Sequence, residues 1–160
     1  MQDHHPKPAF EYSKISEHVY IGTNQCCQGH FNRQLLSKGI SADVSLEETR
    51  IDQPFGVQYY LWLPTRDHAA PSFKQLLVGA RFIQQLAANG VKTYVHCQHG
   101  HGRAPALVAA YLVLEGKTSE RAFELIKRKR PGAHPNAKQL RAVEEFQKVI
   151  SNGKSIKQVR

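Results

Sequence analysis

The chain has 160 residues, of which 22 are Lys or Arg and 13 are Asp or Glu, so its net charge is +9 at neutral pH. This length fits one domain with a single core, and a hydrophobic content of 41% excludes a disordered or low-complexity chain. The longest apolar run, residues 104–114, is shorter than the roughly 20 residues that cross a bilayer, so we expect no transmembrane segment. A flexible lead-in is expected at residues 1–12, one domain at residues 13–152 and a basic tail at residues 153–160.

The first half of the chain alternates short strands with helical segments. Residues 19–22 form the first predicted strand, and a helical pattern at residues 31–36 follows and ends before Gly39. Strands are predicted at residues 40–46 and 57–63, where β-forming residues alternate or cluster.

The second half begins with a helix at residues 72–87, which Ser72 and Gln75 open with a capping-box pattern. A buried strand at residues 93–95 and an apolar helix at residues 104–114 come next. Two further helices are predicted, one from Thr118 to Arg130 and one opened by Asn136 and running to Ile150. This order predicts an α/β domain with a central, mostly parallel sheet flanked by helices.

The segment between the buried strand and the apolar helix carries a cysteine and an arginine at its two ends. Two glycines let this loop curl so that its N–H groups point inward, and the helix N-terminus adds partial positive charge. That field favours a thiolate at Cys97, while the guanidinium of Arg103 can grip two oxygens of a phosphate. The predicted phosphate-binding residues are Gln98, His99, Gly100, His101, Gly102 and Arg103, and His96 is expected to hold Cys97 from behind.

The pattern His96-Cys97-x5-Arg103 is the signature of the cysteine-dependent protein tyrosine phosphatase superfamily. Upstream, residues 63–72 resemble the general-acid loop of small atypical dual-specificity phosphatases, with Asp67 in the position of the acid. Downstream, residues 130–140, which include Asn136, resemble the segment that packs behind the phosphate loop. The resemblance implies an α/β fold of this family and catalysis by Cys97, Arg103 and Asp67, without a cofactor.

The resemblance also implies a function, with alternatives. The main prediction is hydrolysis of a phosphate monoester, on a phosphorylated protein, through a phosphocysteine intermediate. The family normally has Ser or Thr after the arginine, and because Ala104 stands there, the second chemical step is expected to be slow. A phosphoinositide or inositol-phosphate phosphatase is one alternative, and a non-catalytic phosphate-binding module is another. A rhodanese-type sulfurtransferase agrees least with the sequence, because that reaction has no role for Asp67.

Two further groups of residues each have two possible roles. The glycines beside His99 and His101 suit an anion-binding loop better than a tetrahedral metal site, so we predict no metal there. Most of the positive charge lies in residues 116–160, and docking of an anionic surface through Lys127, Arg128, Lys129 and Arg130 is the alternative to a solvated helix end.

We expect no nucleic-acid partner, because no aromatic residues are interleaved with these basic side chains. The three cysteines form a poor disulfide framework, so we predict a cytoplasmic protein in which Cys26 and Cys27 are packing residues. A redox role, in which this pair captures an oxidised Cys97, is the alternative.

Overall fold

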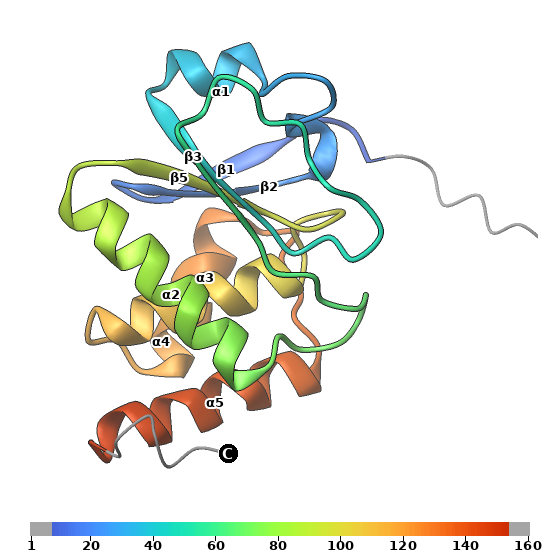
Figure 1. Ribbon diagram of the computed structural model, residues 1–160. Helices are drawn as coiled ribbons and strands as arrows, with labels where there is room; N and C mark the ends of the chain where they lie inside the picture. The colour runs from blue at the N-terminus through green and yellow to red at the C-terminus, as the bar shows by residue number, and fades with distance from the viewer. Residues whose placement is uncertain (1–7, 154–160) are drawn as a thin grey trace, which may run out of the picture.

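The computed structural model describes residues 8–153 and contains one five-stranded sheet in the order β1-β2-β5-β3-β4 (Figure 1). β1 pairs antiparallel with β2, and every other neighbouring pair in the sheet is parallel. The mostly parallel α/β architecture predicted from the sequence is therefore confirmed. The strands are β1 (Tyr12–Ser16), β2 (Val19–Gly22), β3 (Ile40–Ser45), β4 (Tyr59–Trp62) and β5 (Lys92–His96).

Helices cover both faces of the sheet, with α1 on one face and the longer helices on the other (Figure 1). They are the 3₁₀ turn η1 (Asn24–Cys26), α1 (Arg33–Ser37), α2 (Phe73–Ala88), α3 (Arg103–Leu114), α4 (Ser119–Lys129) and α5 (Ala137–Ser151). Within residues 8–153, no helix combines the length and the apolar composition needed to cross a membrane.

The core is built around α3, which contacts α2, α4 and α5 and lies against the sheet. Residues 103–113 of this helix are all buried, as expected for a helix that is apolar on every side. Local capping chemistry fixes where the surrounding helices start. Ser72 and Gln75 form a reciprocal capping box at α2, Asn136 and Gln139 form another at α5, and Thr118 caps α4.

Two details differ from the sequence prediction. Strand β1 was not predicted, because in its sequence only Ile15 is buried and the apolar signal is weak. β4 is shorter than the predicted strand, since Val57 forms only an isolated bridge with Phe55 around Gly56. The predicted lead-in and tail lie mostly at residues 1–7 and 154–160, outside the described residues.

The sheet places its functional end at the last residue of β5. His96 pairs in register with Gly22 of β2 and with Ser45 of β3, so three parallel strands end side by side. Loops that leave the carboxyl ends of neighbouring parallel strands form the usual ligand-binding edge of an α/β sheet. The segment that follows His96 begins at this edge.

Candidate active site

Cys97 follows β5 directly, and the loop of residues 98–102 connects it to the N-terminus of α3. The turn depends on close backbone approaches. Gly100 has a positive φ of 70°, and a Cβ atom there would lie 2.7 Å from the carbonyl oxygen of Gly22. A Cβ atom on Gly102 would overlap the side chain of Gln139. Gly100 is therefore required for the observed path of the loop, whereas a side chain at position 102 would displace the end of the Gln139 side chain.

Arg103 begins α3, and its side chain is almost fully buried. Its Nη1 atom donates hydrogen bonds to the carbonyl oxygens of Leu46, at 3.3 Å, and Thr65, at 2.9 Å. Its Nη2 atom lies 3.8 Å from Glu47 Oε1 and 3.4 Å from Asp67 Oδ1. Backbone carbonyls thus orient the guanidinium before any anion binds, which lowers the entropy lost on binding.

Asp67 lies on the loop between β4 and α2, and its side chain is 58% exposed. The next residue, His68, has a φ of 62°, a left-handed conformation that is uncommon for a residue with a side chain. The N–H of His68 donates to Asp67 Oδ1 at 3.0 Å, and the turn closes where the N–H of Ala69 donates to Arg66. These bonds stabilise a sharp turn that presents the carboxylate to solvent.

The start of α5 holds this turn in place. Asn136 Nδ2 donates to the carbonyl oxygen of His68 at 2.8 Å, and Gln139 Nε2 donates to that of Ala69 at 3.1 Å. The same two side chains form the α5 capping box, so one pair of residues both starts the helix and anchors the Asp67 loop.

Arg130 supports the cysteine loop from the opposite side. It is 4% exposed, and its Nε and Nη2 atoms donate to the carbonyl oxygens of Gly100, at 2.9 Å, and His99, at 2.8 Å. It also reaches Ser13 and Glu11 at the start of the chain. Residues 127–130 were predicted, as one of two alternatives, to dock an anionic surface. That prediction is wrong for Arg130, which is buried, whereas the three residues before it are exposed.

His96 lies behind Cys97 and is completely buried. Its Nδ1 atom lies 3.3 Å from the carbonyl oxygen of Cys97, and its Nε2 atom lies 2.6 Å from Asp52 Oδ2 and 3.3 Å from Asp43 Oδ1. Burial alone would lower the pKa of His96, but the charges and hydrogen bonds of the two carboxylates outweigh it and raise the pKa to about 10. Burial raises the pKa of Asp43 and so favours its neutral form beside the ion pair of His96 with Asp52.

These elements enclose a pocket of about 290 Å³, and four histidines line it: His68, His99, His101 and His134. The rings of His99 and His101 stack with centroids 5.4 Å apart, and that of His134 lies 4.6 Å from His101. Burial, followed by the positive charges of His134, His99 and Arg130, lowers the pKa of His101. The volume accommodates a phosphoryl group together with part of its ester, and protonation of His101 adds positive charge to the pocket in acid.

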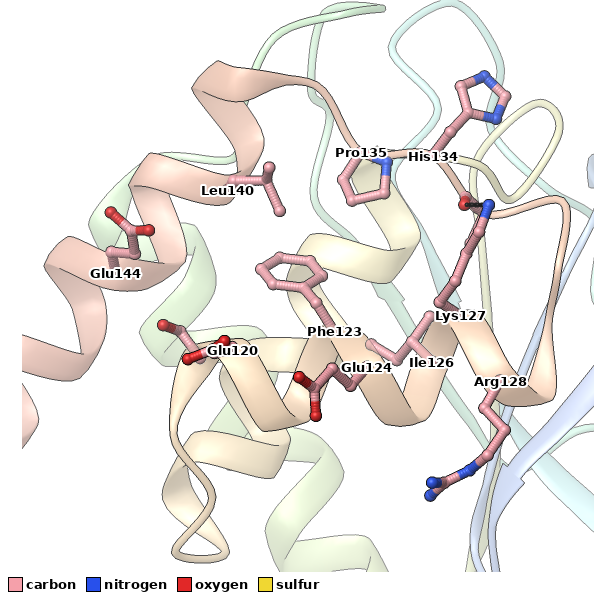
Figure 2. A pocket seen from close by; sticks show the side chains of 12 residues that line it. Glu120, Phe123, Glu124, Ile126, Lys127, Arg128, His134, Pro135, Leu140 and Glu144 are labelled. Carbon is pink, nitrogen blue, oxygen red and sulfur yellow. Dashed lines mark hydrogen bonds between the residues drawn. The ribbon is translucent and has the colours of Figure 1, made fainter.

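A wider groove of about 860 Å³ lies beside this pocket, between α4 and α5, and shares His134 with it (Figure 2). Phe123 and Leu140 face one another across the groove in Figure 2. Acidic side chains border it at Glu120, Glu124 and Glu144. Lys127 lies at the other end and donates hydrogen bonds to the carbonyl oxygens of Pro131 and Ala133.

The structure brings most of the predicted site residues to one pocket. Cys97, Arg103 and Asp67 line it together with Asn136, while His96 lies behind it. The loop residues that also line it are Gln98, His99, His101 and Gly102, and Gly100 shapes the turn between them.

Five residues outside the predicted set of site residues also contribute. His68, His134 and Gln139 line the pocket, and Glu47 and Arg130 contact its arginine and its loop. Arg130 and Gln139 belong to the segment 130–140 that resembles the one packing behind the phosphate loop, whereas Glu47 had no local signal in the sequence.

Comparison with known proteins agrees with this geometry. Residues 19–149 match the protein family described as dual specificity phosphatase, catalytic domain. The phosphatidylglycerophosphate phosphatase PTPMT2 of Arabidopsis thaliana is 37% identical over 94 residues, which are 58% of this chain and 41% of that protein. The tyrosine-protein phosphatase yvh1 of Schizosaccharomyces pombe is 30% identical over 148 residues, 89% of this chain and 43% of that protein. The chain thus spans less than half the length of these two curated relatives.

A solved structure gives a similar match over the whole fold. The crystal structure of PTPMT1 in complex with PI(5)P superimposes with a TM-score of 0.76 at 28% identity. The match covers 90% of this chain and 99% of that one. The match therefore extends far beyond the signature loop.

Proposed function

The chain belongs to the dual specificity phosphatase family, and from this premise we propose that it hydrolyses phosphate monoesters through a phosphocysteine intermediate. The observation that carries the proposal is the convergence of Cys97, Arg103 and Asp67 on one pocket that is large enough for a phosphoryl group. A nucleophile, a bidentate anion ligand and an exposed carboxyl group are the three parts that this chemistry needs.

In the first step, the thiolate of Cys97 attacks phosphorus, so that an S–P bond forms while the ester P–O bond breaks. Arg103 and the inward-facing amides of residues 98–103 bind the equatorial oxygens, where charge is spread in the transition state. Asp67, in its protonated form, gives its proton to the leaving oxygen. Its exposed position beside Arg103 supports this role, because the leaving group must depart toward solvent.

In the second step, Asp67 is a carboxylate and takes a proton from water, whose oxygen attacks the phosphocysteine. The S–P bond breaks, and Cys97 leaves as a thiolate. Ala104 is fully buried directly after Arg103 and offers no hydroxyl to stabilise that thiolate. We therefore propose that breakdown of the intermediate limits the turnover rate.

The preferred substrate is a phosphorylated protein. The groove between α4 and α5 shares His134 with the catalytic pocket, so an extended peptide with its phosphate at Cys97 can continue along the groove. Its apolar floor and acidic border suit a peptide that carries apolar and basic residues near the phosphorylated one.

Trapping of the intermediate tests the proposed chemistry. A phosphotyrosyl peptide is mixed with the protein, the reaction is quenched in denaturant, and mass spectrometry locates the phosphate. We expect phosphate on the peptide that contains Cys97, and Cys97→Ser should abolish turnover while still binding vanadate. Undiminished turnover by Cys97→Ser would contradict the mechanism, and binding without turnover of any ester would indicate a non-catalytic phosphate-binding module.

A phospholipid or inositol phosphate is the second candidate substrate. It is favoured by the similarity to PTPMT1, whose structure holds PI(5)P, and by the imidazoles that line the pocket. Parallel hydrolysis of phosphotyrosyl peptides and of phosphoinositides in mixed micelles separates the two candidates. A kcat/KM at least about tenfold higher for one class, a difference of about 1.4 kcal/mol in transition-state binding, identifies the preferred substrate.

A further inference from the structure

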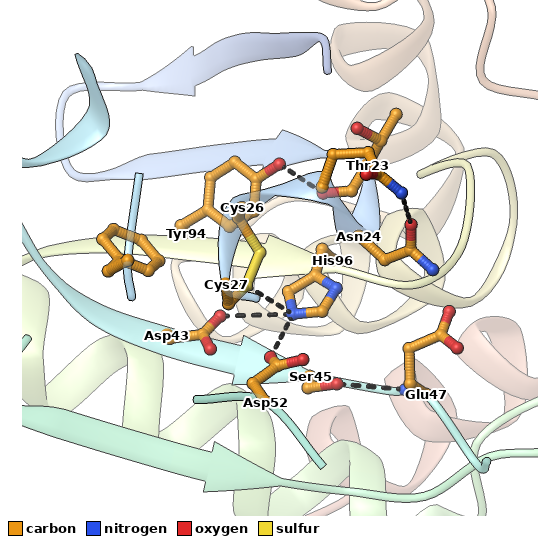
Figure 3. Close-up of a disulfide and its surroundings, with 12 residues drawn as sticks. Thr23, Asn24, Cys26, Cys27, Asp43, Ser45, Glu47, Asp52, Tyr94 and His96 are labelled. Atoms are coloured by element: carbon orange, nitrogen blue, oxygen red, sulfur yellow. Dashed lines mark hydrogen bonds and ion pairs between the residues drawn. A yellow bond between two sulfur atoms is a disulfide. The ribbon is translucent and has the colours of Figure 1, made fainter. Parts of the chain in front are cut away.

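A second cluster of reactive side chains lies behind the catalytic loop, outside the pocket. It consists of Cys26, Cys27, Asp43, Asp52 and His96, which converge in the structure (Figure 3). Each offers one ligand atom, and these atoms all lie within 4.8 Å of one another. All five residues are buried. The mechanism proposed above uses none of them to contact substrate.

The two sulfur atoms are joined as a disulfide between neighbouring residues (Figure 3). This pairing differs from the prediction that Cys26 and Cys27 serve only in packing. Cys26 ends the η1 turn and Cys27 follows it, whereas Asp43 and His96 come from the adjacent strands β3 and β5. The loop therefore brings two sulfurs to the end of a rigid sheet that already presents an imidazole and a carboxylate.

Two distances at His96 match the ligand–ligand separations of a tetrahedral metal site. Zinc binds nitrogen and oxygen at about 2.0–2.2 Å and sulfur at about 2.3 Å, which puts nitrogen and sulfur ligands about 3.6 Å apart and nitrogen and oxygen ligands about 3.3 Å apart. In the structure, His96 Nε2 lies 3.6 Å from Cys27 Sγ and 3.3 Å from Asp43 Oδ1.

Asp43 is the second observation that points to a ligand. Its side chain is completely buried and faces the cluster, and apart from the 3.3 Å ion-pair contact of Oδ1 with His96 Nε2, its carboxylate oxygens have no hydrogen-bond partner among the described residues. Buried carboxylate oxygens are normally hydrogen-bonded or bound to a cation, because burial removes their water. Asp52 differs, because Arg50 Nη2 lies 3.5 Å from its Oδ1 atom and balances its charge.

The far side of the imidazole has the partner that a metal ligand needs. Histidine ligands usually donate their other N–H to a carbonyl or carboxylate, which fixes the ring. His96 Nδ1 lies 3.3 Å from the carbonyl oxygen of Cys97, so the ring can donate there while Nε2 binds an ion.

We propose that Cys26, Cys27, His96 and Asp43 form a zinc site when the disulfide between the two cysteines is reduced. Reduction breaks the S–S bond and adds two electrons and two protons, which give two thiols. A trialkylphosphine supplies the electrons and is oxidised to the phosphine oxide with oxygen from water. Zinc then displaces both thiol protons and binds the thiolates, and His96 gives up the proton on Nε2. The two thiolates and the Asp43 carboxylate carry three negative charges, and the zinc ion carries two positive ones. Asp52 remains paired with Arg50.

Cobalt provides a direct probe, because Co²⁺ bound to thiolates in a tetrahedral site absorbs strongly in the visible and near-ultraviolet. The full chain with Cys97→Ser is used, since the sequence holds three cysteines and only Cys26 and Cys27 then remain. Protein is reduced with a phosphine, freed of reductant without exposure to air, and titrated with Co²⁺ and then Zn²⁺. Metal that remains after gel filtration is counted by mass spectrometry, and the unreduced protein is the matched control.

We expect one metal ion per reduced chain, a thiolate-to-cobalt absorption band that zinc removes, and neither result without reduction. Asp43→Asn should weaken cobalt binding at least about tenfold. Cys26→Ser together with Cys27→Ser should abolish the band. The proposal is wrong if the reduced protein retains no metal, if the unreduced protein binds metal equally, or if the band survives loss of both cysteines. Because the reduced and unreduced protein share one sequence, a folding defect in a variant does not affect this comparison.

Discussion

The side-chain amide nitrogen of Asn136 lies 2.8 Å from the carbonyl oxygen of His68 and donates a hydrogen bond to it. This bond joins the start of α5 to the residue that follows Asp67. Because His68 holds a left-handed backbone conformation, the turn needs such outside support to keep the carboxyl group in position. The start of α5 therefore holds the Asp67 loop in position, although the two are distant in the sequence.

Replacement of Asn136 should separate helix capping from support of the acid loop. Asn136→Ser keeps an oxygen that can cap α5 but loses the amide donor, whereas Asn136→Ala loses both. We expect kcat to fall by about 10- to 100-fold in both variants, because the acid is misplaced. Only the alanine variant should lose a further ~1 kcal/mol of folding free energy. Steady-state kinetics and denaturant unfolding measure the two effects, and an unchanged kcat in Asn136→Ser would show that the bond to His68 does not position Asp67.

Asp67→Asn should affect substrates according to their leaving groups. A phosphotyrosyl or alkyl phosphate needs a proton on its departing oxygen, so we expect a loss of about 10²–10⁴-fold in the rate of the first step. An activated aryl phosphate leaves without that proton, and its burst phase should change little. Stopped-flow measurement of the burst with both substrates tests this. Equal losses for the two leaving groups would indicate a binding role for Asp67 instead.

Ala104→Ser should accelerate the second step. In the natural chain, slow breakdown of the phosphocysteine predicts a burst of phenol from an aryl phosphate, followed by a slower steady rate. A hydroxyl next to Arg103 stabilises the leaving thiolate, so the steady rate should rise and the burst should shrink relative to it. Ala104→Gly, which adds no hydroxyl, is the control and should not raise the rate. If the natural protein shows no burst and Ala104→Ser does not raise the steady rate, another group assists the second step.

Sequence reasoning predicted the parts of this fold whose causes are local. The β5 strand, its glycine-containing loop and the apolar helix α3 are contiguous, and the capping boxes at Ser72 and Asn136 need only four residues each. Cys97 and Arg103 could thus be placed at one site from their spacing alone. Asp67 required a resemblance to a known family, because nothing in its own loop separates an acid catalyst from a turn residue.

The remaining features depend on partners far away in the chain. Arg130 follows three basic residues and looks like a solvated helix end, yet its partners Gly100 and Ser13 lie 30 and 117 positions away. The contact between Asp43 and His96 likewise forms only when β3 pairs with β5. Local patterns of charge do not reveal burial of this kind, because it is decided by strand order.

The buried position of Arg130 predicts a clear difference from its exposed neighbour Arg128. Arg130→Lys keeps the charge but has one nitrogen in place of the three that reach the two loop carbonyls, Ser13 and Glu11, and each buried acceptor that is left unsatisfied costs about 1–3 kcal/mol. We expect a lower melting temperature and a reduced kcat/KM for a small aryl phosphate. Arg128→Lys should change neither. Equal behaviour of the two variants in thermal unfolding and kinetics would contradict a role of Arg130 in shaping the loop.

The lowered pKa of His101 predicts that this residue strengthens substrate binding mainly in acid. Burial, then the charges of His134, His99 and Arg130, oppose its protonation, while Glu11 favours it. A bound phosphate favours the imidazolium, so His101 takes up a proton on binding. The contribution of His101 to phosphate binding is therefore absent well above the usual histidine pKa of about 6.5 and grows as the pH falls. It is complete below the lowered pKa that His101 has in the free protein.

The kcat/KM of the natural protein divided by that of His101→Asn should therefore rise as the pH is lowered from about 8 to about 5.5. A shift of one pKa unit on binding gives at most about a tenfold rise. Dividing the two profiles removes every pH effect that the two proteins share, including titration of the substrate. Stability should show the opposite trend: because folding disfavours the protonated ring, the natural protein should lose more stability in acid than His101→Asn. A ratio that is flat across this pH range would show that His101 does not contact the bound phosphate.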